Sequence, residues 1–265
     1  MYDFTYKKAA SIDDAVASHA AAEDASYMSG GMTLLPTIKL RLAKPSDVID
    51  LAAIGGLDGI TVDGGAVTIG AMTRHAAVNA SNEVQEAIPA LAKLAGGIGD
   101  PHVRNRGTIG GSIANNDPAA DYPAAVVALG ATVKTNKREI AGDDFFTSLF
   151  ETALEPGEIV TGVSFPVPDK AAYMKFPNPA SRYAIVGVFV SQGSGGVRVA
   201  VTGAGLGGVF RAADMEAALA KDFSAGALDG VGVSEGDMLS DIHAAADYRA
   251  HLVGVMAARA VEACG

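Results

Sequence analysis

The sequence contains 265 residues, of which 49% are hydrophobic and 19% are charged, a composition that excludes a disordered chain and predicts one or two folded domains. With 30 acidic against 20 basic residues, the net charge is -10 at pH 7, so neither nucleic acid nor an anionic membrane surface is an expected partner. Cys264 is the only cysteine, so this chain can form neither an internal disulfide nor its own cysteine-ligated iron–sulfur cluster. No apolar run is long enough for a membrane span, and the cytoplasm is the expected location.

The first third of the chain alternates helix and strand signals. Ser11 followed by Asp14 resembles a capping box and predicts a helix over 12–19. Strands are expected at 27–28 and 48–51, with a glycine turn and a short helix between them. This order predicts a strand, glycine turn, short helix, strand unit.

The middle of the chain combines a hairpin, helices and a long irregular segment. Residues 59–70 alternate apolar and small residues around an Asp-Gly-Gly turn, which predicts a β-hairpin. Helices are expected after Thr73 and over 89–94. From 96 to 121 the chain is dense in Gly, Asn, Asp and Arg, which indicates a long functional loop. The apolar segment 122–130 then predicts a buried helix that ends on a left-handed glycine.

The last part of the chain reads as strands followed by helices. Short strands are expected over 131–165, and a Pro-rich linker over 165–169. Apolar runs at 184–190 and 197–202, joined by a Ser- and Gly-rich segment, predict a second hairpin. Apolar residues then recur at helical spacing from Asp241 onward.

A glycine motif at Gly203–Gly208 matches the dinucleotide-binding pattern G-x-G-x-x-G directly after a strand. That fingerprint also requires a helix and a second parallel strand ending in an acidic residue about 20 residues on. The segment after Asp222 has no β-branched run that could form this strand. We therefore interpret these glycines as the glycine-rich edge of an antiparallel hairpin sheet.

Two other glycine pairs are better candidates for a binding site. Ser29–Thr33 lies between a strand and a short helix, where backbone N–H groups and a helix N-terminus can hold a phosphate. Thr108–Ser112 offers the same chemistry a second time, and two such turns suit a pyrophosphate without requiring basic side chains. The alternative for either turn alone is a tight bend between strands.

Several polar residues of the segment that ends near 121 are candidates for other roles. Asp117 precedes a proline and predicts a helix N-cap. Tyr122-Pro123 interrupts such a helix, which leaves the Asp121 carboxylate free to accept from a ligand hydroxyl. His102 is either a loop histidine or an acid–base group. The histidines show no metal-ligand spacing, and we assign neither a catalytic nor a metal-binding residue.

A family resemblance is carried by long stretches of this sequence. Met28–Pro36 and Val103–Asp121 resemble the FAD-binding medium subunit of the molybdenum hydroxylases, the family that includes carbon monoxide dehydrogenase and xanthine dehydrogenase. Gly157–Pro166, Tyr173–Lys175 and Ser240–Arg249 are similar to the later part of that subunit. The resemblance therefore extends over nearly the whole chain.

The resemblance implies an α+β fold with two domains. A FAD-binding domain of the vanillyl-alcohol-oxidase type is expected over 1–166, divided into subdomains of about 1–55 and 56–166. A small α/β C-terminal flavoprotein domain with an antiparallel sheet is expected over 167–265.

The resemblance also implies FAD as the cofactor of this chain, with its pyrophosphate held by the two glycine turns. Val160 or its neighbour Ile159 is expected at the cofactor. The residues implied to bind FAD are Met28, Ser29, Gly30, Gly31, Met32, Thr33, Leu34, Ile98, Thr108, Ile109, Gly110, Gly111, Ser112, Asp121, Ile159, Val160 and Lys175.

The function implied by the resemblance is electron transfer within a multi-chain oxidoreductase. A large partner subunit would carry the molybdenum cofactor, a small partner subunit two [2Fe-2S] clusters, and the flavin of this chain would pass the electrons to an external acceptor. A dimer of such heterotrimers is the expected assembly. The alternatives are a free-standing FAD oxidoreductase of the same fold and a non-catalytic scaffold whose glycine turns are structural.

Overall fold

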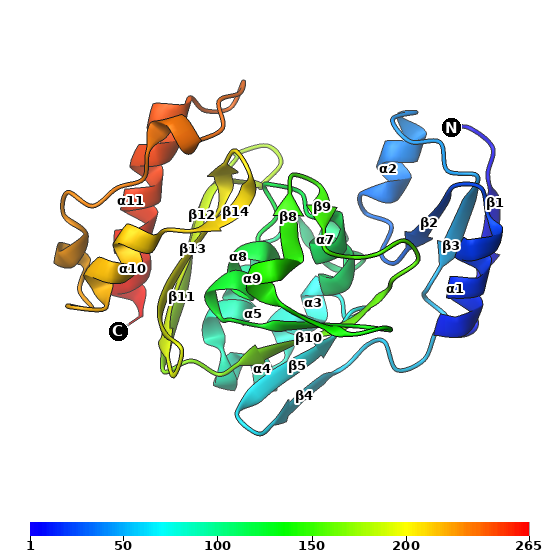
Figure 1. The fold of residues 1–265 in the computed structure, drawn as a ribbon, viewed down its shortest axis with the longest axis horizontal. Coiled ribbons are helices and arrows are strands. Elements are labelled where there is room, and N and C mark those ends of the chain that lie inside the picture. Colours follow the sequence, from blue (N-terminus) through cyan, green and yellow to red (C-terminus); the bar gives the residue numbers. More distant parts are fainter. Residues whose placement is uncertain (265) are drawn as a thin grey trace.

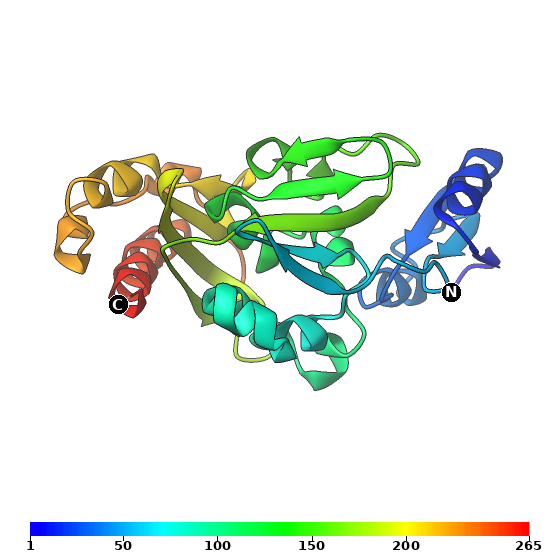
Figure 2. The ribbon, with the colours of Figure 1, turned by 90° about the horizontal axis from the view of Figure 1, so that it is seen from below.

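In the computed structural model, which describes residues 1–264, three sheets follow one another along the long axis of the molecule (Figure 1). Figure 2 shows the N-terminal sheet at one end and the C-terminal helix at the other, with the largest sheet between them. Gly265, the last residue of the expected C-terminal domain, lies outside the described residues.

The N-terminal sheet is parallel, because each pair of strands is connected through a helix. Its strand order is β1-β3-β2. Its elements are β1 (Thr5–Lys8), α1 (Ile12–Ala21), β2 (Ala25–Met28), α2 (Leu34–Lys39) and β3 (Asp47–Asp50). The predicted strand, glycine turn, helix, strand unit is confirmed as β2, α2 and β3.

The capping interaction predicted for the first helix is also present. Ser11 Oγ accepts a hydrogen bond from Asp14 N at 3.1 Å, and α1 runs two residues beyond the predicted end. Its buried Ala15 packs with Ile49 of β3, and the same small core contains Ile159 from the middle of the chain. The N-terminal sheet is therefore attached to the rest of the molecule through residues near Ile159.

The central sheet is antiparallel, with the strand order β4-β5-β10-β6-β7. Its strands are β4 (Ile60–Asp63), β5 (Ala66–Gly70), β6 (Thr132–Thr135), β7 (Glu139–Ala141) and β10 (Val160–Pro166). The predicted hairpin is confirmed as β4 and β5. Gly64 and Gly65 take φ values of 58° and 79° between the strands, as a type I′ turn requires.

Short helices and a small two-stranded sheet cover the central sheet. They are α3 (His75–Ala80), α4 (Asn82–Ala87), α5 (Pro89–Gly96), α6 (Pro101–Arg104), α7 (Ile109–Asn115), α8 (Tyr122–Ala128), α9 (Gly142–Phe145), β8 (Phe146–Ser148) and β9 (Glu151–Thr152). Gly130, with φ 60°, follows α8 as predicted. The main hydrophobic core lies between these helices and the central sheet.

The prediction of one long loop from 96 to 121 is wrong, because the segment contains α6 and α7. Asp100 Oδ1 accepts from Val103 N at 2.9 Å and Thr108 Oγ1 accepts from Gly111 N at 3.1 Å, so each helix has its own N-cap. Both helices are too short to show a hydrophobic period.

The predicted helix start at Asp117 is also wrong. Asp117 Oδ1 accepts from Ala119 N at 2.9 Å, which closes a turn rather than a helix. The helix begins at Tyr122 instead, and Pro123 lies in its first turn, where no N–H donor is needed. Tyr122-Pro123 therefore starts a helix and does not interrupt one.

The C-terminal sheet is antiparallel, in the order β11-β12-β13-β14. Its strands are β11 (Lys170–Pro177), β12 (Ala184–Gly193), β13 (Gly196–Gly205) and β14 (Gly208–Arg211). The helices that follow are α10 (Ala213–Leu219) and α11 (Ala246–Ala263), and two 3-10 turns lie between them at Ala225–Leu228 and Glu235–Asp237. Gly205 pairs with Gly208 across an antiparallel turn, so the rejection of a dinucleotide-binding motif is confirmed.

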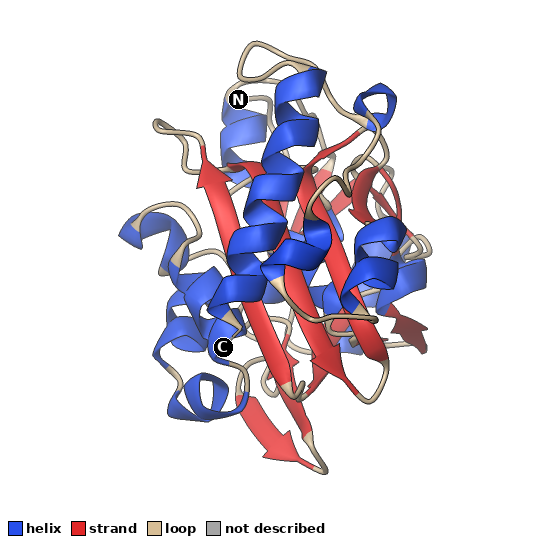
Figure 3. Cartoon of the chain, turned by 90° about the vertical axis from the view of Figure 1, so that its left-hand side faces the viewer, coloured by secondary structure: helices blue, strands red, loops and turns tan. Residues whose placement is uncertain are grey.

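Both faces of this sheet are buried. Helix α11 crosses one face (Figure 3), where Val186 and Val188 contribute to a second core, while Tyr173 and Phe189 on the other face join the main core. The final helix begins at Ala246, five residues after the predicted Asp241, because the Asp241 carboxylate instead accepts from backbone N–H groups of a turn. Among residues 1–264, no helix combines the length and hydrophobicity that crossing a membrane requires.

Candidate functional site

All but two of the residues predicted to bind the cofactor line one cavity of about 510 Å³, a volume within the range of ordinary ligand pockets. Of those residues, Ile109 and Lys175 are not in the lining. The Ile109 side chain is fully buried in the main core, and Lys175 lies behind the cavity wall. The predicted residues that line the cavity are Met28, Ser29, Gly30, Gly31, Met32, Thr33, Leu34, Ile98, Thr108, Gly110, Gly111, Ser112, Asp121, Ile159 and Val160.

The first glycine turn joins β2 to α2 and presents unpaired backbone N–H groups. In the part of the chain that the structure describes, the amides of residues 31–34 have no protein acceptor. Thr33 at the N-cap makes no side-chain capping bond, so the N-terminus of α2 is open as well. A Cβ atom on Gly30 would lie 2.1 Å from Arg106 O, and Gly31 has φ 73°, so both positions require glycine. Such a turn suits an anion.

The second glycine turn is built differently from the expectation. The amides of Ile109 and Gly110 donate to Thr73 O at 3.1 Å and Ala71 O at 2.8 Å, and the Gly111 amide donates to its own N-cap. These amides are therefore already paired, and this turn does not repeat the chemistry of the first. Its contribution to the cavity is the Thr108 and Ser112 side chains and the space that Gly111 leaves free.

The two turns are in direct contact. Ser29 Oγ and Thr108 Oγ1 lie 2.6 Å apart, and Ser29 Oγ also accepts from Gly30 N. A Cβ atom on Gly111 would lie 2.7 Å from Ser29 Oγ, so the missing side chain is what allows the turns to meet. Unpaired amides and adjacent hydroxyls thus form one polar floor of the cavity.

Asp121 reaches the cavity but its carboxylate is not free, contrary to the prediction. It is 4% exposed, and it accepts from Tyr173 OH at Oδ1 at 2.5 Å and from Lys175 Nζ at Oδ2 at 3.2 Å. Burial raises the pKa of Asp121 above its ordinary value, while the Lys175 ammonium and the two hydrogen bonds oppose that increase. The period of two along β11 places Tyr173 and Lys175 on the same face, and both side chains reach Asp121.

His75 is a lining residue that the sequence analysis did not identify. It is 4% exposed, and its Nδ1 has no hydrogen-bond partner among the described residues. The hydroxyl of Tyr122 has none either, and the ring centroids of His75 and Tyr122 lie 5.4 Å apart. Burial, with the nearby Arg104 guanidinium, lowers the pKa of His75 to about 4, so the imidazole is neutral at pH 7. The other candidate, His102, is exposed on α6 and is outside the lining.

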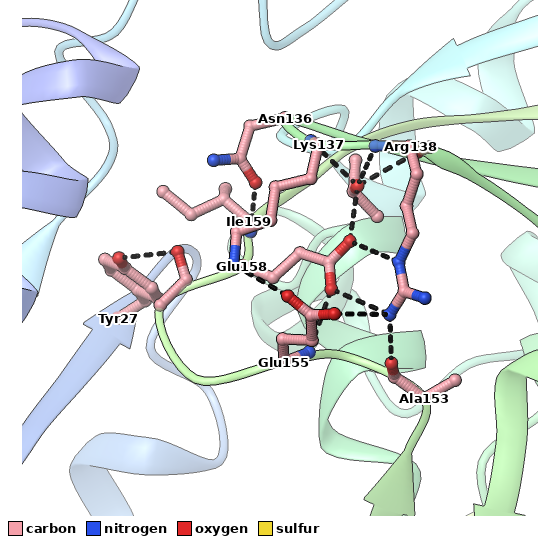
Figure 4. A network of polar contacts seen from close by, with 10 residues as sticks. Tyr27, Asn136, Lys137, Arg138, Ala153, Glu155, Glu158 and Ile159 are labelled. Atoms are coloured by element: carbon pink, nitrogen blue, oxygen red, sulfur yellow. Dashed lines mark hydrogen bonds and ion pairs between the residues drawn. The ribbon is translucent and has the colours of Figure 1, made fainter.

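A polar network holds the chain segment that brings Ile159 and Val160 to the cavity (Figure 4). Glu158 accepts from Arg138, from Thr135 Oγ1 at 2.7 Å and from Glu155 N at 2.8 Å. Burial alone would raise the pKa of Glu158, but these donors, Arg138 first, lower it to about 2.

The same segment also connects two sheets. Tyr27 OH donates to Gly157 O at 3.2 Å, and Ile159 N donates to Asn136 Oδ1 at 2.8 Å. Tyr27 lies in β2, two residues before Ser29, where the first glycine turn begins. The N-terminal sheet and the central sheet are therefore joined directly at the cavity wall.

Two further features were not visible from sequence. Ser181, Arg182 and Tyr183, in the loop between β11 and β12, line the cavity although they lie far along the chain from the glycine turns. Asn116, in the left-handed region with φ 42°, donates to Ser148 O and Glu151 O and so holds the small sheet β8-β9. The Pro- and Asn-rich composition of 176–182 indicates a loop but does not indicate that the loop reaches the cavity.

The residues of the cavity fit a flavin dinucleotide. Arg182 is the one Lys or Arg side chain among the described residues of the lining, so the groups available there to an anion are chiefly amides and hydroxyls. The apolar side chains of Ile98, Ile159 and Val160 suit the faces of an aromatic ring system. Within residues 1–264, no cluster of three His, Cys, Asp or Glu side chains could hold a metal ion.

Comparison with known proteins agrees with this geometry. Residues 2–168 match the family model described as "FAD binding domain in molybdopterin dehydrogenase". The chain is 35% identical over 274 residues to the nicotine 6-hydroxylase medium subunit of Paenarthrobacter nicotinovorans, and 35% identical over 287 residues to the carbon monoxide dehydrogenase medium chain of Afipia carboxidovorans. Each alignment covers 98% of this chain and 96% of the relative.

Solved structures show the same fold over nearly the whole chain. A chain of the Cu,Mo-CO dehydrogenase in its cyanide-inactivated form superposes with a TM-score of 0.90 at 35% identity, covering 98% of this chain and 97% of that one. A chain of quinoline 2-oxidoreductase from Pseudomonas putida 86 superposes with a TM-score of 0.89 at 27% identity, covering 99% and 97%.

Proposed function

The chain belongs to the FAD-binding medium subunits of the molybdenum hydroxylases, which are oxidoreductases, and from this premise we propose that it carries electrons from [2Fe-2S] clusters of a partner chain to an external acceptor. The observation that supports this most is the meeting of the two glycine turns on one cavity, with unpaired amides at residues 31–34. A bound FAD supplies the chemistry, because a flavin accepts electrons singly and can release them in pairs.

The residues of this chain then have separate tasks. The amides of 31–34 and the N-terminus of α2 hold the pyrophosphate. The Ser29 and Thr108 hydroxyls lie at the edge of the space next to it. Ile98, Ile159 and Val160 exclude water from the ring system. Neutral His75 keeps an uncharged polar group in the wall. No side chain is assigned to acid–base chemistry, as suits a subunit that transfers electrons.

The assembly that this role requires is a complex with two other kinds of chain. We assign the molybdenum cofactor to a large partner subunit and the clusters to a small one, since the single cysteine Cys264 cannot ligate a cluster, and we propose a dimer of such heterotrimers. We also propose a domain boundary after residue 166, where β10 ends, which gives a FAD-binding domain over 1–166 and a C-terminal domain over 167–265.

Purification of the native complex tests the proposal. We expect this chain to co-purify with two others that together contain molybdenum and iron, and with about one FAD per medium chain. On rapid anaerobic mixing with reduced small subunit, the flavin absorbance should bleach as the clusters reoxidise. A chain that purifies alone with FAD and oxidises an organic substrate would be a free-standing oxidoreductase. A correctly folded chain that binds no FAD would be a scaffold.

A further inference from the structure

Lys175 occupies an unusual position behind the cavity wall. Its side chain is 11% exposed, and its ammonium donates to Gly97 O at 2.8 Å, to Arg182 O at 3.1 Å and to Asp121 Oδ2 at 3.2 Å. An ammonium group has three N–H donors, so these three acceptors use all of them. Lys175 therefore has no N–H left for a ligand in the cavity.

Each acceptor belongs to a different segment of the cavity wall. Gly97 is the C-cap of α5 and precedes the lining residues Ile98 and Gly99. Asp121 precedes α8 and lines the cavity itself, and Arg182 lies in the β11–β12 loop, whose residues 181–183 also line it. One largely enclosed cation thus joins three segments that are distant in sequence.

The β11–β12 loop is the segment that most needs such a tie. Arg182 has φ 63°, in the left-handed region that a residue with a side chain adopts at a cost of about 1 kcal/mol or more. Several of its other bonds are local, with Asn178 Oδ1 accepting from Ala180 N and Ser181 N. Its other side-chain contacts to distant segments are a long bond of 3.4 Å from Arg182 Nη1 to Gly99 O and the exposed contact between Asn178 Nδ2 and His243 Nδ1 at 3.2 Å. Residues 180–183 are exposed, so few packing contacts hold them.

We propose that Lys175 is a positioning residue for the flavin site: it fixes the β11–β12 loop and the end of α5 against Asp121, so that the cavity wall is already formed before the cofactor binds. This inference rests on the proposed function, in which FAD occupies the cavity. It differs from the role implied by resemblance, in which Lys175 contacts FAD itself. A wall formed in advance raises affinity, because less conformational freedom is lost on binding.

The test compares Lys175→Met, Lys175→Gln and Lys175→Arg in the full chain. Lys93→Met is the matched control, because Lys93 is an exposed lysine on the same helix, α5, that ends at Gly97. Three properties are measured: the rate of trypsin cleavage after Arg182 in the FAD-free protein, the Kd for FAD from quenching of flavin fluorescence, and the visible circular dichroism of bound FAD.

Lys175→Met and Lys175→Gln should each raise the cleavage rate after Arg182 in the FAD-free protein and weaken FAD binding, both by about tenfold, which corresponds to one hydrogen bond to a charged group. The flavin dichroism should change as well, which a general loss of stability would not cause. Lys175→Arg keeps the charge next to Asp121 and should restore part of the affinity. Lys93→Met should match the wild type in all three.

Asp121→Asn provides an independent check. If Lys175 acts by joining the loop to Asp121, Lys175→Met should change the cleavage rate much less when Asp121→Asn is already present. Weaker FAD binding without faster cleavage of the FAD-free loop would overturn the proposal, because Lys175 would then be a direct ligand. Unchanged cleavage and unchanged Kd would overturn it too. If the wild type binds no FAD, the proposed function fails, whereas the cleavage rate still reports on the loop.

Discussion

The hydroxyl oxygens of Ser29 and Thr108 lie 2.6 Å apart, although 79 residues separate them in the sequence. Ser29 follows a strand of the parallel N-terminal sheet, and Thr108 caps a helix that covers the central sheet. The contact therefore joins the N-terminal sheet to the helices of the central sheet at the cavity that is proposed to hold FAD. Its contribution to the free energy of unfolding and its effect on FAD binding can be measured separately.

Removing both hydroxyls should reveal an energetic coupling between the turns. Ser29→Ala and Thr108→Ala should each lower the free energy of unfolding by about 1 kcal/mol, because each removes the hydrogen bond between the two hydroxyls. Thr108→Ala also removes the N-cap of α7. The double variant should lose less than the sum, since the hydrogen bond is lost only once. Urea denaturation of the four proteins measures this. Ser29→Ala combined with Ser81→Ala, the distant N-cap of α4, should be additive.

The neighbouring glycines Gly110 and Gly111 should respond differently to alanine. A Cβ atom on Gly110 would lie 2.5 Å from Ala71 Cβ, inside the protein, so Gly110→Ala should lower the free energy of unfolding by roughly 1–3 kcal/mol. On Gly111 it would meet the Ser29 and Thr108 hydroxyls at the cavity, so Gly111→Ala should weaken FAD binding by about tenfold with a smaller change in stability. Thermal unfolding and flavin titration distinguish these effects; equal affinity for FAD in Gly111→Ala and wild type would contradict the pyrophosphate assignment.

Buried His75 should make stability fall in mild acid. Its pKa is about 4 in the folded protein against an ordinary value of 6.5, so the unfolded chain binds a proton first as pH decreases. The contribution of neutral His75 to the free energy of unfolding is complete above pH 6.5. It is lost as the pH falls from 6.5 to about 4, and the loss amounts to at most about 3 kcal/mol. Urea denaturation across this range should show a shallower decline in His75→Gln. His102→Gln, at an exposed histidine, should follow the wild type.

Glu158 should stabilise the cavity wall only while it is ionised. Its folded-state pKa of about 2 lies below the ordinary 4.5, so its contribution is present above pH 4.5 and is lost as pH falls toward 2. Glu158→Gln should therefore lower the free energy of unfolding by about 1–3 kcal/mol at pH 7, and this difference should shrink in acid. Because Ile159 follows directly, FAD binding should weaken as well. The exposed Glu86→Gln is the control, and an equal loss there would remove the assignment.

Much of the architecture follows from short-range patterns. The capping interaction of Ser11, the Gly64-Gly65 hairpin and the helix that ends before Gly130 depend on residues within a few positions of one another. The two glycine turns were recognisable for the same reason, because a tight turn next to a helix requires particular residue types at neighbouring positions. The failure of Gly203–Gly208 as a nucleotide motif was also visible, since the required second strand is missing nearby.

The errors lie where distant segments supply the stabilising contacts. Helices α6 and α7 have no apolar period of their own and are held by caps and by close approaches, such as that of Gly107 to His75, where a Cβ atom would lie 2.6 Å from the ring. The start of α11 was misplaced because Asp241 pairs with the buried Arg249 and with backbone N–H groups of its own turn.

Local chemistry in the chain thus predicts two turns able to bind phosphate, but only folding shows that they differ. The first keeps its amides unpaired, whereas the amides of the second are taken by Thr73 and Ala71 in the segment that follows β5. Folding also places Lys175 beside Asp121, 54 positions earlier, and gives its ammonium three acceptors within the protein. A hydrogen-bonding group can serve a ligand only if no partner within the protein has claimed it, and such partners are set by long-range packing.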